Sequence, residues 1–368
     1  IHLPLDYTSE TVLNKAAKLI NVDKKFFKSC TIFRRSIDAR KKDNIFFLAT
    51  VDAELFVNEE KICKKFKNAE IAEKYEYNVE KFRGTVSPVV VGAGPAGLFA
   101  ALILAQSGAN PILIERGRDV DTRTKDVHNF WKSGILDTTS NVQFGEGGAG
   151  AFSDGKYNIT NDFGGTLYEY IGKKAATELM EYVDEINMAH GGEGTKMYST
   201  AGTSLKKVCI QNRLKLLDAS VRHLGTDINL VVLGQLYDEL KELVDFYFES
   251  PVTHIESLEA GIYRVWVGET SYDCKKCIVS VGRSGSKWME HICKELEIPT
   301  KSNRVDLGVR VELPAVLFSH LTDELYESKI VYRTEKFEDN VRTFCMNPRG
   351  IVVNENTNGI VTVNGHSY

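Results

Sequence analysis

The chain has 368 residues, of which 43% are hydrophobic and 26% are charged, and its formal net charge is −4. This length is enough for two or three domains, and the composition is typical of a soluble globular protein. The slightly acidic balance gives no sign of a surface for polyanions, so no nucleic acid is expected as a partner. Seven cysteines without a signal peptide favour a reducing compartment, and a cytoplasmic location is expected.

Residues 1–84 are predicted to form a small α+β module related to half of a ferredoxin-like fold. A helix capped by Thr8 or Ser9 is expected, and strands at 31–39 and 45–51 form a hairpin. The apolar stripe of the helix consists of Val12, Leu13, Ala16, Leu19 and Ile20. A basic cluster on the hairpin is interpreted as a solvated face, with a docking surface as the alternative; it consists of Arg34, Arg35, Arg40, Lys41 and Lys42.

The stretch over 85–116 reads TVSPVVVGAGPAGLFAALILAQSGANPILIER, with a glycine-rich turn between an apolar run and an apolar helix-like segment. Gly92 permits a tight turn, Gly94 lets the backbone approach a pyrophosphate, and Gly97 allows the helix to pack closely on the strand. The helix N-terminus offers free N–H groups and a positive partial charge. Glu115 ends the second apolar run at a spacing suited to accepting hydrogen bonds from a ribose. The pattern predicts a β-turn-α-β unit that binds a dinucleotide.

Two other interpretations of this stretch are weaker. The apolar run from Pro88 to Ala105 approaches the length of a membrane span, but three glycines and a proline at its start suit a turn between buried elements better. A glycine-rich turn without a ligand is disfavoured by the acid at the end of the second run. We therefore expect no membrane span here.

A second glycine-rich stretch, NVQFGEGGAGAFSDGK, covers 141–156. Backbone N–H groups of such a loop can line a bound cofactor, as nests of N–H groups do for anions. A flexible surface loop is the alternative, but surface linkers rarely carry two phenylalanines such as Phe144 and Phe152.

Downstream, the periodicity predicts helices at 167–190 and 228–244 and strands at 245–249, 261–270 and 277–281. The polar residues from 191 to 204 are predicted to form a mobile loop or lid. The last part of the chain alternates like strands of a mixed or antiparallel sheet, at 305–313, 329–333, 341–346, 351–353 and 360–363.

Cys274 and Cys277 have the C-x-x-C spacing of redox disulfides, metal ligands or ordinary packing residues. Packing is the favoured interpretation because Cys277 begins the apolar run CIVSV. No metal site is expected, because the chain offers no second pair to complete four zinc ligands.

In this order the motifs resemble the flavoprotein oxidoreductases of the glutathione-reductase structural class. More narrowly, the chain resembles the family of uncharacterised FAD-dependent dehydrogenases, also called NAD-FAD-utilizing dehydrogenases. The resemblance covers nearly the whole chain, and the stretch at 141–156 is its most family-specific part. It rests on VVVGAGPAGLFAALILAQSGANPILIERG (89–117), NVQFGEGGAGAFSDGK (141–156), RHLGTD (222–227), CIVSVGRSG (277–285) and DLGVRVELP (306–314).

The resemblance implies FAD as the cofactor, with its pyrophosphate on the first glycine-rich turn and its ribose on Glu115. Val252 is then expected at the adenine, and Gly282 at a second turn where Ser-Val-Gly replaces the usual Ala-Thr-Gly. The cofactor-binding residues implied in this way are Gly92, Gly94, Pro95, Ala96, Gly97, Glu115, Arg116, Arg123, Gly145, Glu146, Gly147, Gly148, Ala149, Gly150, Val252 and Gly282.

The resemblance also implies an α/β fold in which a Rossmann-like FAD-binding domain is built from 85–165 and 205–285. A helical and loop insertion occupies 166–204, and an α+β substrate domain occupies 286–368. Proteins of this class close the FAD site with a C-terminal Gly-Asp element that is not found here, so the substrate domain is expected to be incomplete at its C-terminus.

The predicted function is that of an FAD-dependent oxidoreductase acting on a small molecule. Because no G-x-G-x-x-G is found outside the turn at 92–97 and the loop at 145–150, NAD(P)H is expected to dock only transiently, or a protein to donate the electrons. His223 and Arg283 are the weak candidates for catalytic residues, since Arg283 follows the second turn and can meet a carboxylate. A flavoprotein of RNA modification or ring saturation, and a regulatory or scaffold protein with a degenerate FAD site, are the alternatives.

Overall fold

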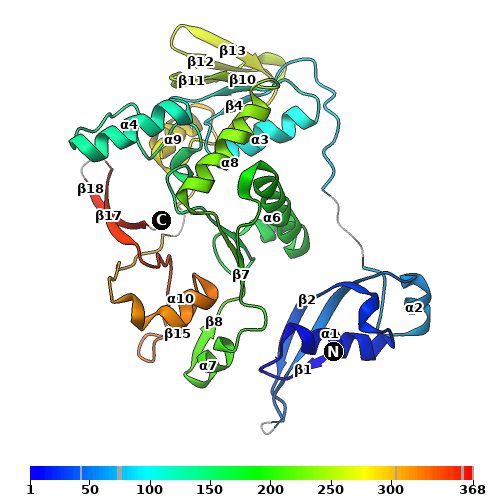
Figure 1. The fold of residues 1–368 in the computed structure, drawn as a ribbon. Coiled ribbons are helices and arrows are strands. Elements are labelled where there is room, and N and C mark those ends of the chain that lie inside the picture. The colour runs from blue at the N-terminus through cyan, green and yellow to red at the C-terminus, as the bar shows by residue number, and fades with distance from the viewer. Residues whose placement is uncertain (42–43, 73–76, 303–304, 358–359, 367–368) are drawn as a thin grey trace.

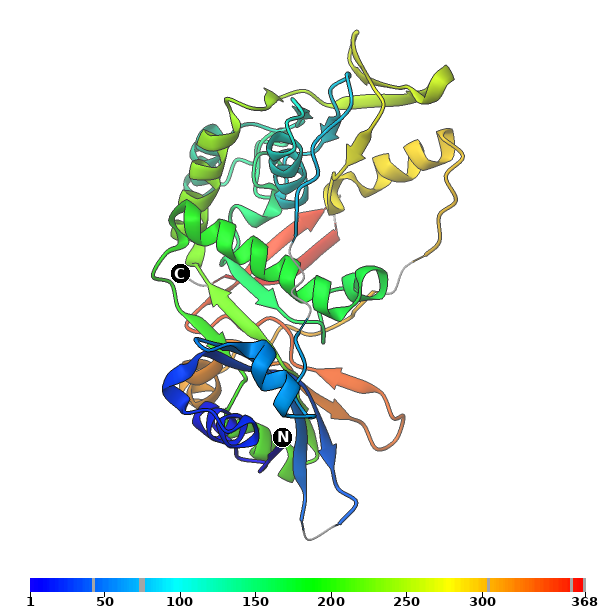
Figure 2. The ribbon, with the colours of Figure 1, turned by 90° about the vertical axis from the view of Figure 1, so that its right-hand side faces the viewer.

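The computed structural model of the protein describes residues 1–41, 44–72, 77–302, 305–357 and 360–366. Figure 1 shows the N-terminal module set apart from the layers that contain strands β4 and β10, with the chain's last elements below those layers. In the second view the module lies at the same level as these lower elements (Figure 2).

The N-terminal module has the helix and hairpin that the sequence predicts. Its elements are β1 (His2–Leu3), α1 (Ser9–Ile20), β2 (Phe27–Asp38), β3 (Phe46–Leu55) and α2 (Glu59–Lys65). The three strands pair antiparallel in the order β1-β3-β2, which is the arrangement of the first three strands of a ferredoxin-like fold. Thr8 caps α1 in a capping box with Thr11, and the helix packs Val12 against Phe47 of the sheet.

Arg35 of the hairpin joins this module to the rest of the chain. Its Nη2 atom donates to Asp218, at 2.9 Å from Oδ1 and 2.7 Å from Oδ2, and Lys206 pairs with the same carboxylate. Burial acts to raise the pKa of Asp218, but the two cations hold it below its ordinary value. The predicted basic cluster is therefore partly used inside the molecule, while Lys42 lies outside the described residues.

The central sheet is parallel and four-stranded, in the order β10-β5-β4-β14. Its strands are β4 (Val89–Val91), β5 (Ile112–Ile114), β10 (Asp245–Tyr247) and β14 (Cys277–Val279). Parallel strands are covered on both faces and so read as continuous apolar runs, which is why β4 is three valines. Val90 faces the core formed with α3 (Pro95–Gln106) and α8 (Gly225–Leu240).

Val89 and Val91 face the opposite side of the sheet, where a second core lies. This face is covered by an antiparallel sheet of β11 (Val252–Ser257), β12 (Tyr263–Val267) and β13 (Thr270–Cys274), and by α9 (Ser286–Glu295). Only β12 falls within a predicted strand; β11 and β13 are additions that the sequence periodicity missed.

The middle of the chain adds helices, a small antiparallel sheet and a strand that pairs with a later strand. The helices are α4 (Val120–Ser133), α5 (Leu167–Ile171), α6 (Lys173–Asn187) and α7 (Leu205–Gln211), and the strands are β6 (Lys156–Ile159), β7 (Met197–Ser199), β8 (Leu214–Leu216) and β9 (Ser220–His223). The sheet has the order β6-β9-β7, and β8 is the strand outside it. The single helix predicted over 167–190 is divided at Gly172, whose φ of 81° is incompatible with a continuous helix. The predicted lid over 191–204 contains β7, which pairs with β9 and so holds these residues in a sheet.

The last part contains α10 (Ser319–Leu325), β15 (Ile330–Arg333), β16 (Asn340–Arg342), β17 (Ile351–Thr357) and β18 (Ile360–His366). Strand β15 pairs antiparallel with β16 and with β8, whereas β17 and β18 form a hairpin. The strand predicted at 305–313 is wrong, because this segment has no ladder partner among the described residues. Its apolar side chains are exposed, Leu307 by 95% and Val309 by 89%.

No helix within the described ranges has the length and apolar content that crossing a bilayer requires. Helix α3, the centre of the alternative interpretation as a span, has 12 residues and begins only at Pro95.

We predict that Asp218→Asn loosens the contact between the N-terminal module and the rest of the chain. Asparagine keeps the size of the side chain but removes the charge that Arg35 and Lys206 bind. For a partly exposed ion pair worth about 0.5–1 kcal/mol, release of the module by limited proteolysis should become roughly two- to fivefold faster. Asp273→Asn, which breaks the exposed pair with Arg264, is the matched control, and equal rates for both variants would contradict the prediction.

Candidate functional site

Two of the three glycines in the turn after β4 are required by packing. Gly92 has a φ of 100°, and a Cβ there would lie 2.6 Å from the carbonyl oxygen of Ser280. A Cβ on Gly97 would lie 1.8 Å from the carbonyl oxygen of Gly92. At Gly94, in contrast, the nearest atom to such a Cβ is the Cα of Gly148 at 3.8 Å. The protein itself leaves room for a side chain at Gly94, so the space beside it is available to a ligand.

The N-terminus of α3 opens onto this space. Gly94 is the N-cap residue and has no side chain to accept a hydrogen bond from the first turn, and Pro95 occupies the first helical position. Pro95 and Ala96 are exposed, while Gly97 is buried against the strand. The first N–H groups of the helix therefore face outward, where an anionic group can bind them.

The carboxylate of Glu115 joins three segments from behind this turn. Its Oε2 atom accepts a hydrogen bond from the N–H of Ala93 at 2.7 Å, and Oε1 accepts from Gly117 at 2.9 Å and from Gly145 at 3.1 Å. The residue is only 5% exposed. Carboxylate oxygens can each accept more than one hydrogen bond, so these contacts remain compatible with a ribose hydroxyl as a further donor.

Arg123 fixes the second glycine-rich loop. Its side chain is 0% exposed, and its guanidinium donates to the carbonyl oxygens of Asn141 at 2.8 Å, Glu146 at 2.6 Å and Gly148 at 2.7 Å. Burial lowers the pKa of Arg123 to about 10, which leaves it charged at neutral pH. The guanidinium thus binds loop carbonyls from behind, and in this structure Arg123 positions the loop.

Glu146 also lies behind the loop, and its side chain is fully buried. Its Oε2 atom accepts from the N–H of Val120 at 2.8 Å, at the start of α4, while Oε1 has no partner among the described residues. Burial raises the pKa of Glu146 to about 7. The open face of the loop is formed instead by residues 148–150, of which Ala149 is exposed.

The loop packs directly on the first turn. A Cβ on Gly148 would lie 3.0 Å from the Cα of Gly94, so the two backbones approach more closely than side chains allow. From the far side, Asn229 of α8 donates through Nδ2 to the carbonyl oxygen of Gly150 at 2.8 Å. The sequence analysis missed Asn229, because nothing in its local pattern distinguishes it from other polar residues of an amphipathic helix.

Residues beyond Glu115 extend the same edge of the sheet. The N–H of Ser250 donates to the carbonyl oxygen of Glu115 at 2.9 Å, which brings the start of β11 at Val252 next to this strand end. Arg116 is exposed and its guanidinium lies 3.7 Å from the ring centroid of Phe144. Although the residue as a whole is exposed, partial desolvation of its guanidinium lowers the pKa of Arg116, and Glu115 acts in the opposite direction.

The second predicted turn, after β14, also reaches this edge. The hydroxyl of Ser280 donates to the carbonyl oxygens of Gly92 at 3.0 Å and Val91 at 3.1 Å. Gly282 has a φ of 61°, and both it and Arg283 are exposed. The carboxyl ends of four parallel strands thus gather the turn at 92–97, Glu115, the loop at 145–150, Val252 and Gly282.

His223 lies elsewhere, at the end of β9. Its Nε2 atom is 2.7 Å from the hydroxyl of Tyr326, and the two rings are stacked with centroids 3.9 Å apart. Burial and the nearby ammonium of Lys156 lower the pKa of His223, whereas Asp154 acts to raise it. Arg283 and His223 therefore occupy different parts of the structure: Arg283 is exposed at the cofactor turn, and His223 is partly buried against Tyr326.

The surroundings of His223 form a buried ionic cluster. The ammonium of Lys156 contacts Glu327 at 2.7 Å, Asp154 at 3.0 Å and the carbonyl oxygen of Met346 at 2.8 Å, and Lys329 pairs with Glu327. Burial acts to lower the pKa of Lys156, but the two carboxylates raise it above its ordinary value. The sequence analysis did not predict a role for Glu327, because Glu327 lies far along the chain from the family-like loop that ends at Lys156.

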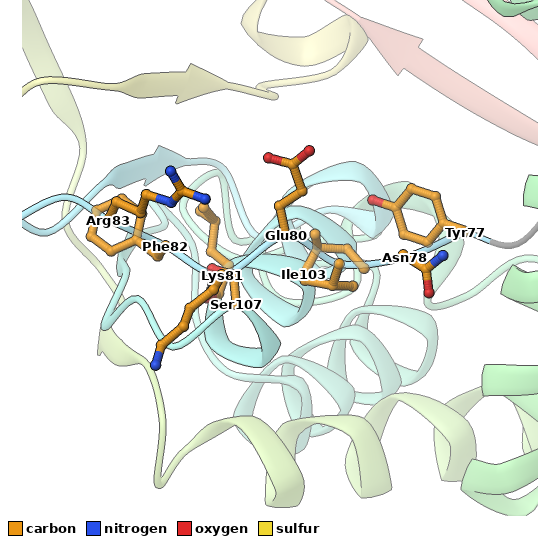
Figure 3. Close-up of a pocket in the computed structure, with 10 residues that line it drawn as sticks. Tyr77, Asn78, Glu80, Lys81, Phe82, Arg83, Ile103 and Ser107 are labelled. Atoms are coloured by element: carbon orange, nitrogen blue, oxygen red, sulfur yellow. Dashed lines mark hydrogen bonds between the residues drawn. The ribbon is translucent and has the colours of Figure 1, made fainter.

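A separate pocket is lined by residues 77–83 and by Ile103, Leu104 and Ser107 (Figure 3). The segment at 77–83 is held there by the N–H of Phe82, which donates to the carbonyl oxygen of Ser107 at 2.8 Å. This is the C-terminal end of α3, about 18 Å along its 12 residues from the glycine-rich turn. The pocket is therefore distinct from the site at the strand ends.

Residues 87–283 match the model of the FAD binding domain family. The chain belongs to this family. The match spans the turn, Glu115, the loop and Gly282, and FAD is thus the cofactor that the motifs predict. Residues 1–54 of this FAD-binding chain match a domain of unknown function, DUF8436.

The FAD-binding chain is 32% identical over 385 residues to an uncharacterized protein of Clostridium beijerinckii (strain ATCC 51743 / NCIMB 8052). That match covers 100% of this chain but 65% of the relative, so the chain spans about two thirds of the relative's length.

Two of the solved structures with partial similarity are an oxidase and a dehydrogenase. The glycine oxidase from Geobacillus kaustophilus is 12% identical, with a TM-score of 0.35 over 58% of each chain. The 3-ketosteroid-delta4-(5alpha)-dehydrogenase from Rhodococcus jostii RHA1 is 15% identical, with a TM-score of 0.35 over 56% of this chain and 48% of that one.

We predict opposite outcomes for alanine at two glycines of the turn. Gly97→Ala should destabilise the fold by about 3 kcal/mol or more, because the new Cβ overlaps the carbonyl oxygen of Gly92. Gly94→Ala should change the free energy of unfolding by less than about 1 kcal/mol, since its Cβ meets only an ordinary contact. Urea unfolding of the protein without added flavin checks both, and equal losses would contradict the described turn.

We predict that Glu146→Gln removes a pH dependence of stability. The pKa of Glu146 rises from the ordinary 4.5 to about 7 in the folded state, so the native protein binds more protons than the unfolded one between these values. Wild-type stability therefore falls as the pH rises from about 4.5 to about 7. Glutamine cannot ionise, so the variant should gain roughly 1–3 kcal/mol over wild type at pH 8 and little at pH 5.

The check is urea unfolding of both proteins at the two pH values. Glu290→Gln, which changes an exposed carboxylate, is the control and should leave the difference between pH 5 and pH 8 as in wild type. If the stability difference between pH 5 and pH 8 were the same in Glu146→Gln as in wild type, the pKa of the buried carboxyl would not be raised.

Proposed function

We propose that the chain acts as an FAD-dependent oxidoreductase, a dehydrogenase or reductase, on a small molecule. The observation that carries this proposal is the open helix N-terminus beside Gly94, faced by the glycine-rich loop and held by Glu115. A side chain would fit the space at Gly94 without disturbing the fold, which is the property of a backbone cradle kept clear for a ligand. FAD, when bound, supplies the transfer of hydride or electrons.

Each predicted site residue receives a proposed role. The turn from Gly92 to Gly97, with Pro95 and Ala96 exposed at the helix start, binds the pyrophosphate. Glu115 binds the ribose with Arg116 beside it, Val252 lies at the adenine, and Gly282 borders the nucleotide from the second turn. The loop from Gly145 to Gly150 follows the cofactor toward its isoalloxazine, with Arg123 and Glu146 supporting the loop from behind.

The proposed domain division follows the same logic. Residues 85–165 and 205–285 form the FAD-binding domain, 166–204 an insertion, and 286–368 the part that contacts substrate. The stacked pair of His223 and Tyr326 is proposed to lie on the substrate side, since it joins these two parts. The lowered pKa of His223 keeps its imidazole neutral at neutral pH, a state able to accept a proton.

We propose the flavoproteins of the glutathione-reductase class as the wider group, and the NAD-FAD-utilizing dehydrogenases as the narrower one. NAD(P)H then acts as a transient reductant, or a protein donates the electrons, because both G-x-G-x-x-G matches of the sequence, at 92–97 and 145–150, are assigned to FAD. Arg283, exposed beside Gly282, is proposed to meet a carboxylate of the substrate or of the reductant.

We predict that protein mixed with FAD and desalted is yellow, with absorption near ~450 nm that bleaches with NADH or NADPH. Gly94→Ala should weaken FAD binding by at least about tenfold, because its Cβ fills the space of the pyrophosphate. Gly165→Ala is the matched control, since a Cβ there meets nothing within 4 Å. Flavin fluorescence titration measures both affinities.

Three other outcomes have distinct meanings. Wild-type protein that takes up no FAD would contradict the enzyme and favour the regulatory or scaffold role. Unchanged binding in Gly94→Ala would disprove the assigned pyrophosphate site. Yellow protein that neither nicotinamide bleaches would favour a protein electron donor.

A further inference from the structure

Cys274 and Cys277 lie together where two sheets of the molecule meet. Cys274 is the last residue of β13 and is 0% exposed, while Cys277 is the first residue of β14 and is partly buried. Cys277 packs against the core cluster that contains Cys274, and both thiols are free. The fold thus places in one cluster the two cysteines for which the C-x-x-C spacing alone left three interpretations open.

The position of the two cysteines in the central sheet argues against contact with the cofactor turn and against a metal site. Cys277 pairs with Val89, the first residue of β4, whereas the glycine-rich turn follows Val91 at the other end of that strand. In a parallel sheet the pair therefore lies on the amino edge, opposite to the edge that carries the cofactor turn. No cluster of three or more side chains able to hold a metal ion occurs in the described part of the chain. Ordinary packing and dithiol chemistry with a partner from solution are the two interpretations that remain.

We propose that Cys274 and Cys277 form a reversible disulfide by exchange with disulfides of low molecular weight. Cys277 is the more accessible thiol, and the exposed Lys275 and Lys276 beside it attract anionic disulfides such as oxidised glutathione. The interaction of the two thiols lowers the pKa of Cys274 and raises that of Cys277, so the sulfur that attacks second is the more acidic one. The inference uses no flavin contact and stands apart from the proposed function.

The exchange balances in two steps. The thiolate of Cys277 attacks one sulfur of oxidised glutathione, the glutathione S–S bond breaks, and one glutathione thiolate leaves. The sulfur of Cys274 then attacks Sγ of Cys277 in this mixed disulfide, and the second glutathione thiolate leaves. The two cysteines are oxidised by two electrons, one oxidised glutathione is reduced to two thiols, and the cysteine protons pass to the leaving thiolates.

The test equilibrates the folded protein in buffers of reduced and oxidised glutathione, quenches with acid and alkylates the remaining thiols. We expect two of the seven cysteines to lose their label together as the buffer becomes oxidising, with a dependence on the square of reduced glutathione. Trypsin cleaves after Lys275 and Lys276, so mass spectrometry should detect a peptide pair joined by a disulfide. Reducing buffer should reverse the loss.

Cys277→Ser should abolish the linked peptides, and Cys30→Ser, at a partly buried cysteine of the N-terminal module, is the matched control that should keep them. The wild-type experiment is decisive even where a variant folds poorly. Seven labelled cysteines at every glutathione ratio, or a stable glutathione adduct on Cys277 without a linked peptide, would overturn the proposal.

Discussion

Three backbone N–H groups converge on the buried carboxylate of Glu115, and the geometry of the cofactor edge depends on them. They come from the turn after β4, from the chain just after β5 and from the second glycine-rich loop. Without an acceptor at this point, three buried donors would be left unpaired, each at a cost of about 1–3 kcal/mol. The side chain of Glu115 thereby holds Ala93 and Gly145 next to each other, although they are far apart in sequence.

The second glycine-rich loop has buried charged side chains on one side and exposed backbone on the other. Arg123 and Glu146 are fully buried behind the loop, where they bind carbonyl oxygens and the start of α4. The exposed side is left to glycines and to Ala149, which present backbone rather than side chains. Such a division suits a long cofactor with many acceptor atoms, because the backbone can approach it while buried charges fix the backbone.

The sequence predicted the central unit well because its signals are local. The valines of β4, the glycines of the turn and Glu115 form one short pattern, and each is where the pattern requires. Prediction failed where an element depends on a neighbour. The alternation at 305–313 is typical of a strand, yet the segment pairs with no strand within the described ranges, and Leu307 is exposed.

The sequence analysis also missed strands that are present in the structure. Strands β11 and β13 exist because they pair with β12, although their own residues carry little alternation. Sequence spacing also does not predict contacts between distant segments. Examples are the orientation of Arg123, the hydrogen bond from the first residue of α4 to Glu146, and the cluster around Lys156. Sequence therefore identified the residues near the site better than it identified what each side chain does.

Hydrogen–deuterium exchange of the chain with and without FAD tests the central claim most directly, since it reports which backbone segments the cofactor covers. The account predicts that residues 92–97 and 145–150 gain protection together when FAD binds, because Glu115 joins them into one cradle. Binding of FAD that protects neither segment, or that protects only the separate pocket at 77–83, would contradict it.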